Sequence, residues 1–496
     1  MISQRRSVIF IVAFWVILLT AKNVLAQAPV KVGTKLFTES VIIGDITQQL
    51  LIEDGVEVEF YKQLGGTRIL WNALLSGDID IYPDYTGTII EEMLGGGEFK
   101  TITELNQKLE EFGLQATQSL GFNNTYALGM VKTKANKLGL ESISDLRAHP
   151  QLNYGFSNEF INRADGWAGI QQNYRLATTS VTGLDHDLAY RGLQGGSIDV
   201  IDLYSTDAEI DYYKLKVLKD DLQFFPDYQA VILYRKELET THPNAVKILK
   251  RLEGKISEEE MVAMNAAVKI DGRADVEVAS AFIQEAFGVQ TEFTTSTLWS
   301  RFITNTLGHL YLVGISLGLA ILFAIPLGII AAKIPAIEKS VLSFVGVLQT
   351  IPSLALLVFM IPLLGIGAVP AMAALFLYSL LPIVRNTHSG IKNISTPLIE
   401  SAQALGLPNS VILKKIELPL ALPTILAGIK TSAVINVGTA TLGALIGAGG
   451  YGQPILTGIR LDSMSLILEG AIPAAVLALL VQGLFDLVEK RFVVRG

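Results

Sequence analysis

The sequence predicts a two-lobed α/β domain followed by an all-α polytopic membrane domain of about five spans. Apolar residues make up 50% of the 496-residue chain, and they are concentrated at the N-terminus and after about residue 305. Between these regions, residues 29–288 alternate short apolar strands with helix-length segments, which is typical of a largely parallel sheet. After them, the stretch 307–488 is apolar enough to cross a bilayer several times.

Composition and charge exclude several classes of protein. The chain has no cysteine, so it can form neither a disulfide nor a thiolate metal site. Its formal net charge is −8 and it has no Lys/Arg-rich run, which argues against nucleic-acid binding. We expect no metal and no cofactor. The histidines lack ligand spacing and are expected to be surface or cap residues: His149, His186, His242, His309 and His388.

The N-terminus has the features of an export signal. Arg5 and Arg6 precede an apolar run from residue 8 to about residue 20, and residues 24–26 supply a small-x-small cleavage pattern. The run is marginal for a membrane span, so we expect a signal peptide at 1–26, with an uncleaved anchor as the alternative. Either one would deliver the residues that follow to the outside of the cytoplasm.

The α/β region contains a short internal sequence repeat, which we call the echo. Residues 77–81 (GDIDI) lead to Tyr85, and residues 196–200 (GSIDV) lead to Tyr204, so each tyrosine stands eight residues after its glycine. Each copy follows a helical segment and contains a short apolar strand, so we expect both tyrosines at or just past the carboxyl end of a strand. Ligands bind at that edge in open α/β sheets. Two such units predict two lobes that face one cleft.

The same pattern predicts the lobe boundaries. Lobe one should contain residues 29–132 and 229–288, and lobe two should contain residues 133–228. The chain would then cross between the lobes twice, which gives a hinge suited to closure around a ligand. A polar, Thr-rich segment, 289–300, should link this domain to the membrane domain at 301–496.

Six segments of the α/β region carry a family resemblance: 33–39 (GTKLFTE), 64–67 (LGGT), 82–88 (YPDYTGT), 124–128 (NTYAL), 163–166 (RADG) and 224–228 (FFPDY). They resemble the type II substrate-binding proteins for quaternary ammonium osmoprotectants, namely glycine betaine, proline betaine, choline and carnitine. The resemblance implies a type II periplasmic-binding-protein fold, with a box of four tyrosines around the ammonium head. Carried over by position, the box is Tyr85, Tyr126, Tyr204 and Tyr228. The resemblance assigns the carboxylate end of the ligand to Lys35, Thr88 and Arg163.

Elementary chemistry supports this assignment. A quaternary ammonium has no N–H to donate, so aromatic faces must recognise it, at roughly 0.5–2 kcal/mol per ring. Arg163 offers a planar fork for a carboxylate, and Lys35 adds a point charge. Two cations suit a zwitterion better than choline, so glycine betaine or a close relative is the leading substrate. Four aspartates are expected to cap turns or pair with the basic residues: Asp84, Asp165, Asp207 and Asp227.

The C-terminal domain predicts an odd number of membrane spans. They can be drawn at about 307–332, 340–364, 367–385, 419–447 and 466–488. With the α/β domain outside, this number places the positive residues after the first, third and fifth spans inside, as the positive-inside rule requires. Prolines within the spans predict kinks that neighbouring helices satisfy: Pro326, Pro352, Pro362 and Pro382.

A polar segment, residues 400–419, interrupts the apolar block. It cannot lie in hydrocarbon, where unpaired backbone groups are costly, so it must lie at the membrane surface. Its spacing resembles the EAA loop of type I bacterial ABC-importer permeases, which docks on a cytoplasmic ATPase. Ser401 stands where that family usually has alanine. The resemblance assigns coupling to Glu400, Ser401, Ala402, Gly406, Ile416, Leu418 and Pro419.

Together these resemblances predict the fused substrate-binding and permease subunit of an ATP-driven ABC importer for quaternary ammonium osmoprotectants. The sequence has no G-x-x-x-x-G-K-[ST] phosphate loop, so we expect no enzyme activity and ATP hydrolysis by a separate ATPase subunit. We expect a homodimer in the bilayer of the bacterial inner membrane, with the binding domain on the extracytoplasmic side. The first alternative is the same importer for choline, carnitine or ergothioneine. A ligand-gated channel is the remote one, since the chain has no T-V-G-Y-G filter.

Overall fold

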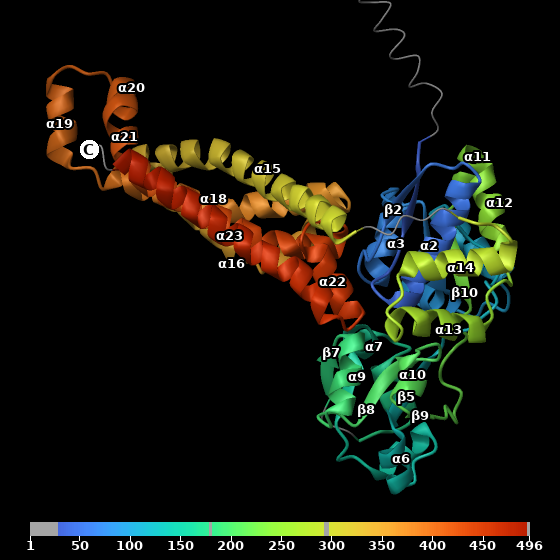
Figure 1. The fold of residues 1–496 in the computed structure, drawn as a ribbon. Coiled ribbons are helices and arrows are strands. Elements are labelled where there is room, and N and C mark those ends of the chain that lie inside the picture. The colour runs from blue at the N-terminus through green and yellow to red at the C-terminus, as the bar shows by residue number, and fades with distance from the viewer. Residues whose placement is uncertain (1–27, 178–180, 292–296, 494–496) are drawn as a thin grey trace, which may run out of the picture.

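The computed structural model describes residues 28–177, 181–291 and 297–493. Two α/β lobes lie at one end of the molecule, and a bundle of long helices extends away from them (Figure 1). The predicted class, a two-lobed α/β domain followed by an all-α membrane domain, is confirmed. The predicted signal peptide at 1–26 lies outside the described residues, as do residues 292–296 of the predicted linker.

Lobe one is built on a five-stranded sheet with the strand order β2-β1-β3-β10-β4. β1 pairs in parallel with β2 and β3, whereas β10 is antiparallel to β3 and β4. The strands are β1 (Val30–Gly33), β2 (Val58–Tyr61), β3 (Ile81–Tyr85), β4 (Leu114–Ala116) and β10 (Ala230–Arg235). Because β10 follows lobe two in the sequence, the returning chain completes this sheet.

Lobe two repeats this plan with the order β7-β6-β8-β5-β9. β6 pairs in parallel with β7 and β8, and β5 is antiparallel to β8 and β9. The strands are β5 (Tyr126–Val131), β6 (Tyr154–Ser157), β7 (Val181–Leu184), β8 (Val200–Tyr204) and β9 (Leu215–Leu218). β3 and β8, which contain the two copies of the echo, occupy equivalent positions in the two sheets.

The first boundary between the lobes differs from the prediction. We expected lobe one to continue to residue 132, but β5 pairs only with strands of lobe two in the sheets that the structure describes. The first crossing therefore lies before Tyr126. An isolated bridge between Asn123 and Gln229 joins the two crossing segments at the hinge. The physical reason is the antiparallel pairing of β5 with β8, a long-range contact that a scan along the chain does not contain.

Helices surround both sheets (Figure 1). Those of the two lobes are α2 (Thr38–Glu53), α3 (Thr67–Ser76), α4 (Thr86–Thr88), α5 (Ile102–Leu109), α6 (Lys132–Leu138), α7 (Asn158–Asn162), α8 (Trp167–Asn173), α9 (His186–Gln194), α10 (Glu209–Tyr212), α11 (Leu238–Thr241), α12 (Pro243–Arg251), α13 (Glu258–Lys269) and α14 (Asp275–Phe287). The glycines of the echo end two of these helices: Gly77 (φ 79°) follows α3, and Gly196 (φ 73°) lies just past α9. Left-handed backbone favours glycine, which explains why both copies begin with it.

Helix α2 anchors lobe one. It packs against β1, β2 and β3 and against α12, α13 and α14. Its Ile42, Ile43 and Ile46 are fully buried, and removing each such side chain from water contributes about 1.5–3 kcal/mol. The first turn of α2, which contains Glu39, is therefore held firmly where the two lobes meet.

Four segments of the described chain are long and apolar enough to cross a membrane. They are α15 (Leu298–Lys333), α18 (Ala368–Lys392), the segment Asn409–Ile446 that contains α20 (Asn409–Ile412) and α21 (Leu418–Thr439), and α23 (Met464–Val493). The first, third, fourth and fifth predicted spans fall on these segments. A shorter helix, α22 (Gly452–Arg460), lies between the bundle and the lobes (Figure 1).

The second predicted span, 340–364, is not one straight helix. The structure has α16 (Pro335–Thr350) and α17 (Ser353–Leu364), which are bent by 99° relative to each other. The bend follows from Pro352, which has no N–H to donate and forces the residue before it out of helical geometry. Ile351 is accordingly extended (φ −69°, ψ 126°). This segment is either a broken span or a re-entrant loop.

The polar segment 400–419 lies at the opposite end of the bundle from the two lobes. Figure 1 shows α19 (Thr396–Ala404) and α20 at the tip farthest from the α/β domain. The two helices are joined by a turn at Gly406, whose φ is 77°. A segment at this end can meet a protein on the other side of a bilayer from the lobes.

Candidate ligand-binding site

The four predicted box tyrosines lie at the ends of strands in both sheets. Tyr85 is the last residue of β3 and Tyr204 the last residue of β8, as the echo predicted. Tyr126 begins β5 and is the register partner of Tyr204. Tyr228 lies two residues before β10, on the segment that returns to lobe one. The cluster therefore combines residues of both lobes and of the hinge.

The rings of these tyrosines are connected by direct contacts. The ring centroid of Tyr126 lies 5.1 Å from that of Tyr204 and 5.6 Å from that of Tyr228. Tyr85 joins the cluster through Phe37, whose centroid lies 6.1 Å from Tyr85 and 5.7 Å from Tyr204. Phe37 was not among the predicted site residues, although it lies in one of the family-like segments.

The two predicted cations are buried and already paired with aspartates. The Lys35 ammonium donates to Asp84 at 2.5 Å and lies 5.7 Å from the ring centroid of Tyr85. The Arg163 guanidinium pairs with both oxygens of Asp165 and lies 5.3 Å from the ring centroid of Tyr126. The predicted ion-pair role of Asp84 and Asp165 is confirmed. The third predicted polar residue, Thr88, is buried in the short helix that follows Tyr85.

Two box phenols donate hydrogen bonds to buried carboxylates. The Tyr85 hydroxyl donates to Glu39 at 2.5 Å, and the Tyr228 hydroxyl donates to Asp165 at 2.5 Å. Charge-assisted hydrogen bonds of this kind are short and strong. They fix the rotation of both rings.

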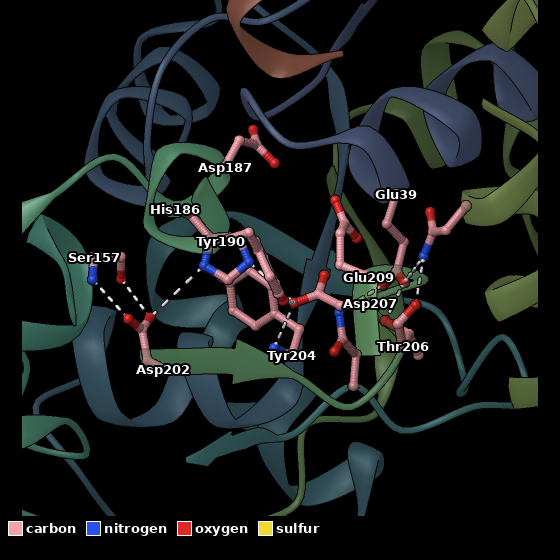
Figure 2. A network of polar contacts seen from close by, with 12 residues as sticks. Glu39, Ser157, His186, Asp187, Tyr190, Asp202, Tyr204, Thr206, Asp207 and Glu209 are labelled. Atoms are coloured by element: carbon pink, nitrogen blue, oxygen red, sulfur yellow. Dashed lines mark hydrogen bonds and ion pairs between the residues drawn. The ribbon is translucent and has the colours of Figure 1, made fainter. Parts of the chain in front are cut away.

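Glu39, which the sequence analysis did not single out, connects the two lobes. It also accepts a hydrogen bond from Thr206 at 2.6 Å (Figure 2). Two further donors are Asn124 at 2.8 Å and Asn265 at 3.1 Å. Burial raises the pKa of its carboxyl above 4.5, and these donors oppose the shift. Thr206 belongs to lobe two and Asn124 to the hinge, so the bonds to Glu39 form when the lobes are closed. Its place in the 33–39 segment was the one signal that pointed to it.

His186 is a second residue that the sequence analysis misjudged. It is largely buried, with 12% of its side chain exposed, and its ring packs at a tilt against Tyr204 with 4.4 Å between centroids. The imidazole pairs with Asp207 at 3.0 Å and with Asp202 at 3.8 Å (Figure 2). Burial opposes its protonation, but the charges of Asp207 and Asp202 outweigh burial and raise its pKa well above 6.5. His309 is also buried, and its Nε2 lies 2.9 Å from the Val437 carbonyl oxygen.

A pocket of about 140 Å³ lies between the lobes beside the ring cluster. It is lined by Lys35, Leu36, Phe37, Gly65, Gly66, Ser157, Asn158, Glu159, Leu184, Asp185, His186, Asp187 and Tyr204. The lobes approach closely here, because a Cβ on Gly66 would lie 2.1 Å from Oε1 of Glu159. Of the box tyrosines, Tyr204 reaches this pocket. Since the other rings pack against one another, a ligand that is to touch all four requires them to separate.

The predicted coupling residues lie on and around α19 and α20. Gly406 forms the turn and Ala402 is buried beneath it, so the first part of this segment folds as two short helices. The Ser401 hydroxyl donates to the Pro397 carbonyl oxygen at 2.7 Å, so the serine in place of alanine is satisfied within its own helix. Glu400, Ser401 and Pro419 are exposed, while Ile416 and Leu418 are half-buried.

Comparison with known proteins decides the family. Residues 28–285 match the substrate-binding domain of ABC-type glycine betaine transport systems. Residues 324–494 match the inner membrane component of binding-protein-dependent transport systems. The chain belongs to this ABC transporter family. The predicted fusion of a binding protein with a permease is thereby confirmed.

Three curated relatives each match part of this ABC transporter chain. The ergothioneine transport permease/ergothioneine binding protein EgtU of Helicobacter pylori is 36% identical over 55% of this chain, which spans half (50%) of that relative's length. The glycine betaine/carnitine/choline transport system permease protein OpuCB of Bacillus subtilis is 42% identical over 38% of this chain and 87% of its own. The carnitine transport binding protein OpuCC of Listeria monocytogenes is 33% identical over 56% of this chain and 96% of its own.

Proposed function

We propose that this chain is the receptor and permease of an ATP-driven importer for quaternary ammonium osmoprotectants. The observation that carries the proposal is the ring cluster of Tyr85, Phe37, Tyr204, Tyr126 and Tyr228 at the meeting point of two lobes. Several aromatic faces that converge on one point offset the cost of removing water from a cation without N–H groups. The family matches on both halves of the chain support import as the activity.

The leading substrates are glycine betaine and proline betaine. This proposal is supported by Arg163 and Lys35, which lie against two of the box rings and are within reach of a carboxylate on a ligand whose ammonium head contacts those rings. Both cations have an aspartate partner, however, so their free charge is smaller than the sequence indicated. Choline, carnitine and ergothioneine therefore stay as alternative cargoes, and relatives named for each of them support this.

Titration calorimetry on the full chain in nanodiscs tests the proposal. The panel is glycine betaine, proline betaine, carnitine, choline and ergothioneine, with glycine as the control that lacks methyl groups. We expect at least one quaternary compound to bind, and glycine to bind at least about tenfold more weakly than that compound. If no compound of the panel binds, or if glycine binds equally well, the proposed cargo class is wrong.

We further propose that two copies of this chain pair with two copies of a cytoplasmic ATPase. In this arrangement the lobes lie outside the membrane and the segment 400–419 contacts the ATPase. The support is the position of α19 and α20 at the tip of the bundle farthest from the lobes (Figure 1). ATP turnover by the reconstituted assembly should rise with ligand, since coupling between sites is reciprocal. ATP turnover that does not change while ligand binds would contradict the proposed coupling to the ATPase.

A ligand-gated channel is not favoured. Residues 324–494 match a transport component, and the described helices include the surface segment 400–419 that a channel does not need. The same reconstituted assembly separates the two activities, because a channel passes ions without ATP.

A further inference from the structure

The permease contacts the binding domain through α22 and the turn that follows it. Arg460, Leu461 and Asp462 are consecutive at the end of α22, and Figure 1 places this helix beside both lobes. The turn is tied back to its helix by backbone hydrogen bonds, Leu461 N–H to Thr457 O at 2.9 Å and Ser463 N–H to Gly458 O at 2.8 Å. The three residues therefore form a short, firmly held element, which we call the docking turn.

Arg460 binds lobe one. Its guanidinium is 4% exposed and makes two parallel bonds to Asp275, at 2.9 Å and 2.8 Å, and one to Thr38 Oγ1 at 3.2 Å. Asp275 begins α14 and Thr38 begins α2, directly after Phe37 of the ring cluster. Burial opposes ionisation of Asp275, but the charge of Arg460 outweighs it and lowers the pKa of that carboxyl. A bidentate, buried pair of this kind is specific in geometry.

Other contacts between α22 and lobe one reinforce this anchor. Gln453 and Thr457 donate hydrogen bonds to the side-chain oxygen of Gln63, at 3.1 Å and 3.0 Å. Gln63 is buried and left-handed (φ 60°), and it directly precedes the 64–67 segment that lines the cleft. Lobe one is thus attached to the permease through residues next to the candidate ligand site.

The other end of the docking turn binds lobe two. Asp462 forms an ion pair with Arg191 of α9, and α22 packs against α9. Leu461, between the two charged residues, packs against the apolar core of the binding domain. Arg191 directly follows Tyr190 and lies five residues after His186 in α9. These two residues contact Asp207 and Tyr204, so this contact also adjoins the candidate site.

The lobes are closed in this structure. Glu39 of lobe one accepts from Thr206 of lobe two at 2.6 Å, and Glu159 of lobe two lies against Gly66 of lobe one. Opening the cleft moves α9 away from α2 and α14. Three residues span at most about 10 Å, so the docking turn cannot stay bound to both lobes when they separate.

We propose that the docking turn, Arg460–Leu461–Asp462, binds both lobes at once and thereby favours the closed binding domain. An element that contacts one of two states must shift the equilibrium towards that state. By reciprocity, closure of the lobes must favour whichever permease conformation presents the turn in this way. The inference concerns the interface between the domains and does not depend on the identity of the ligand.

Charge swaps in the full chain test this proposal without added ligand. The chain has no cysteine, so Asn72→Cys on α3 and Gln172→Cys on α8, both exposed, give two unique spin-label sites on opposite lobes. The distance distribution between the labels, measured in nanodiscs, reports the ratio of closed to open lobes. The variants are Arg191→Asp and Asp462→Arg, singly and together, then Arg460→Asp and Asp275→Arg, singly and together.

We expect each single variant to lower the closed-to-open ratio at least about threefold, and each double swap to restore it to within about twofold. Arg191 and Asp462 are about half exposed, so their variants do not disturb a core and keep the test valid if a buried Arg460 variant fails to fold. Arg251→Asp is the matched control, because Arg251 pairs with Asp54 within lobe one.

Three results overturn the proposal. The first is a wild-type chain without a closed population. The others are single variants with the wild-type closed-to-open ratio, and double swaps whose ratio is no higher than that of the single variants. Because no ligand is added, the spin-label result does not depend on whether any compound of the calorimetric panel binds. The calorimetric result likewise does not depend on the docking turn. The two claims are therefore tested separately.

Discussion

Tyr126 and Tyr204 are cross-strand partners in the antiparallel pair β5–β8, and their ring centroids lie 5.1 Å apart. Directly opposed side chains in such a pair stand about 4.5–5.5 Å apart at Cβ, so strand register alone sets the spacing of these rings. Tyr85, in contrast, belongs to lobe one. The predicted box is thus divided into a fixed wall on lobe two, Tyr126 and Tyr204, and a movable ring on lobe one, Tyr85, so hinge motion changes the space between them.

Replacing Tyr204 by alanine should weaken binding of the preferred quaternary ammonium at least about tenfold. The loss arises because this ring belongs to the fixed wall and also borders the pocket between the lobes. Calorimetry on the full chain measures it. The matched control is Tyr212→Ala, a lobe two tyrosine that is 58% exposed. Equal affinities in the wild type and in Tyr204→Ala would remove Tyr204 from the site.

The sequence was sufficient for the features that depend on local pattern. The glycine-to-tyrosine spacing located Tyr85 and Tyr204 at strand ends, because a helix end, a short strand and its terminus occupy a fixed number of residues. Long apolar segments likewise located the membrane helices, since bilayer thickness sets their length.

Features that depend on tertiary contacts were missed. The roles of Glu39 and His186 are set by partners that come from distant parts of the chain, such as Asn265 and Asp202. For the same reason β5 was assigned to the wrong lobe, because its pairing with β8 joins distant parts of the chain. Pro352 indicated a break in the second span, but the 99° angle depends on how α16 and α17 pack.

Neutralising the buried ion pair of Arg163 and Asp165 should distinguish zwitterionic from purely cationic ligands. The double variant Arg163→Gln/Asp165→Asn removes both charges together, so neither is left buried without a partner. If Arg163 receives the carboxylate, betaine affinity should fall at least about tenfold while choline affinity changes by less than about threefold. Calorimetry with both ligands gives the two values. An equal loss of affinity for betaine and choline would show that the Arg163–Asp165 pair maintains the structure of the site and does not receive the carboxylate.

Lobe two should lose a pH-dependent contribution to its stability when His186 is replaced. The pKa of His186 is raised well above 6.5 by Asp207 and Asp202, against the effect of burial, so its contribution is fully present below about pH 6.5. The contribution is lost as the pH rises through that raised pKa. At pH 6, His186→Gln should lower the free energy of unfolding by about 3 kcal/mol, because the buried Asp202 and the largely buried Asp207 lose a charged partner.

Thermal unfolding of the full chain at several pH values between 6 and 10 measures this difference. The gap in Tm between the wild type and His186→Gln should narrow as the pH rises. His149→Gln serves as the control, since the half-buried His149 makes no ion pair with any residue that the structure describes. If the Tm difference stays constant between pH 6 and pH 10, His186 stabilises the lobe by packing and its charge does not contribute.

A substitution at Gly406 should uncouple the permease from its ATPase without affecting ligand binding. Gly406 has φ 77° and ends α19, with its N–H donating to Gln403 O at 2.9 Å and the Leu407 N–H to Ala402 O at 3.2 Å. No heavy atom lies within 4 Å of an added Cβ, so Gly406→Ala introduces backbone strain of roughly 1 kcal/mol and no clash. The strain favours a different backbone conformation between α19 and α20, so ligand-stimulated ATP turnover should fall at least about threefold.

Gly483→Ala in α23 is the matched control, because its added Cβ also meets open space and its backbone is not left-handed. Turnover that is equal in the two variants would show that the turn at Gly406 does not transmit the signal.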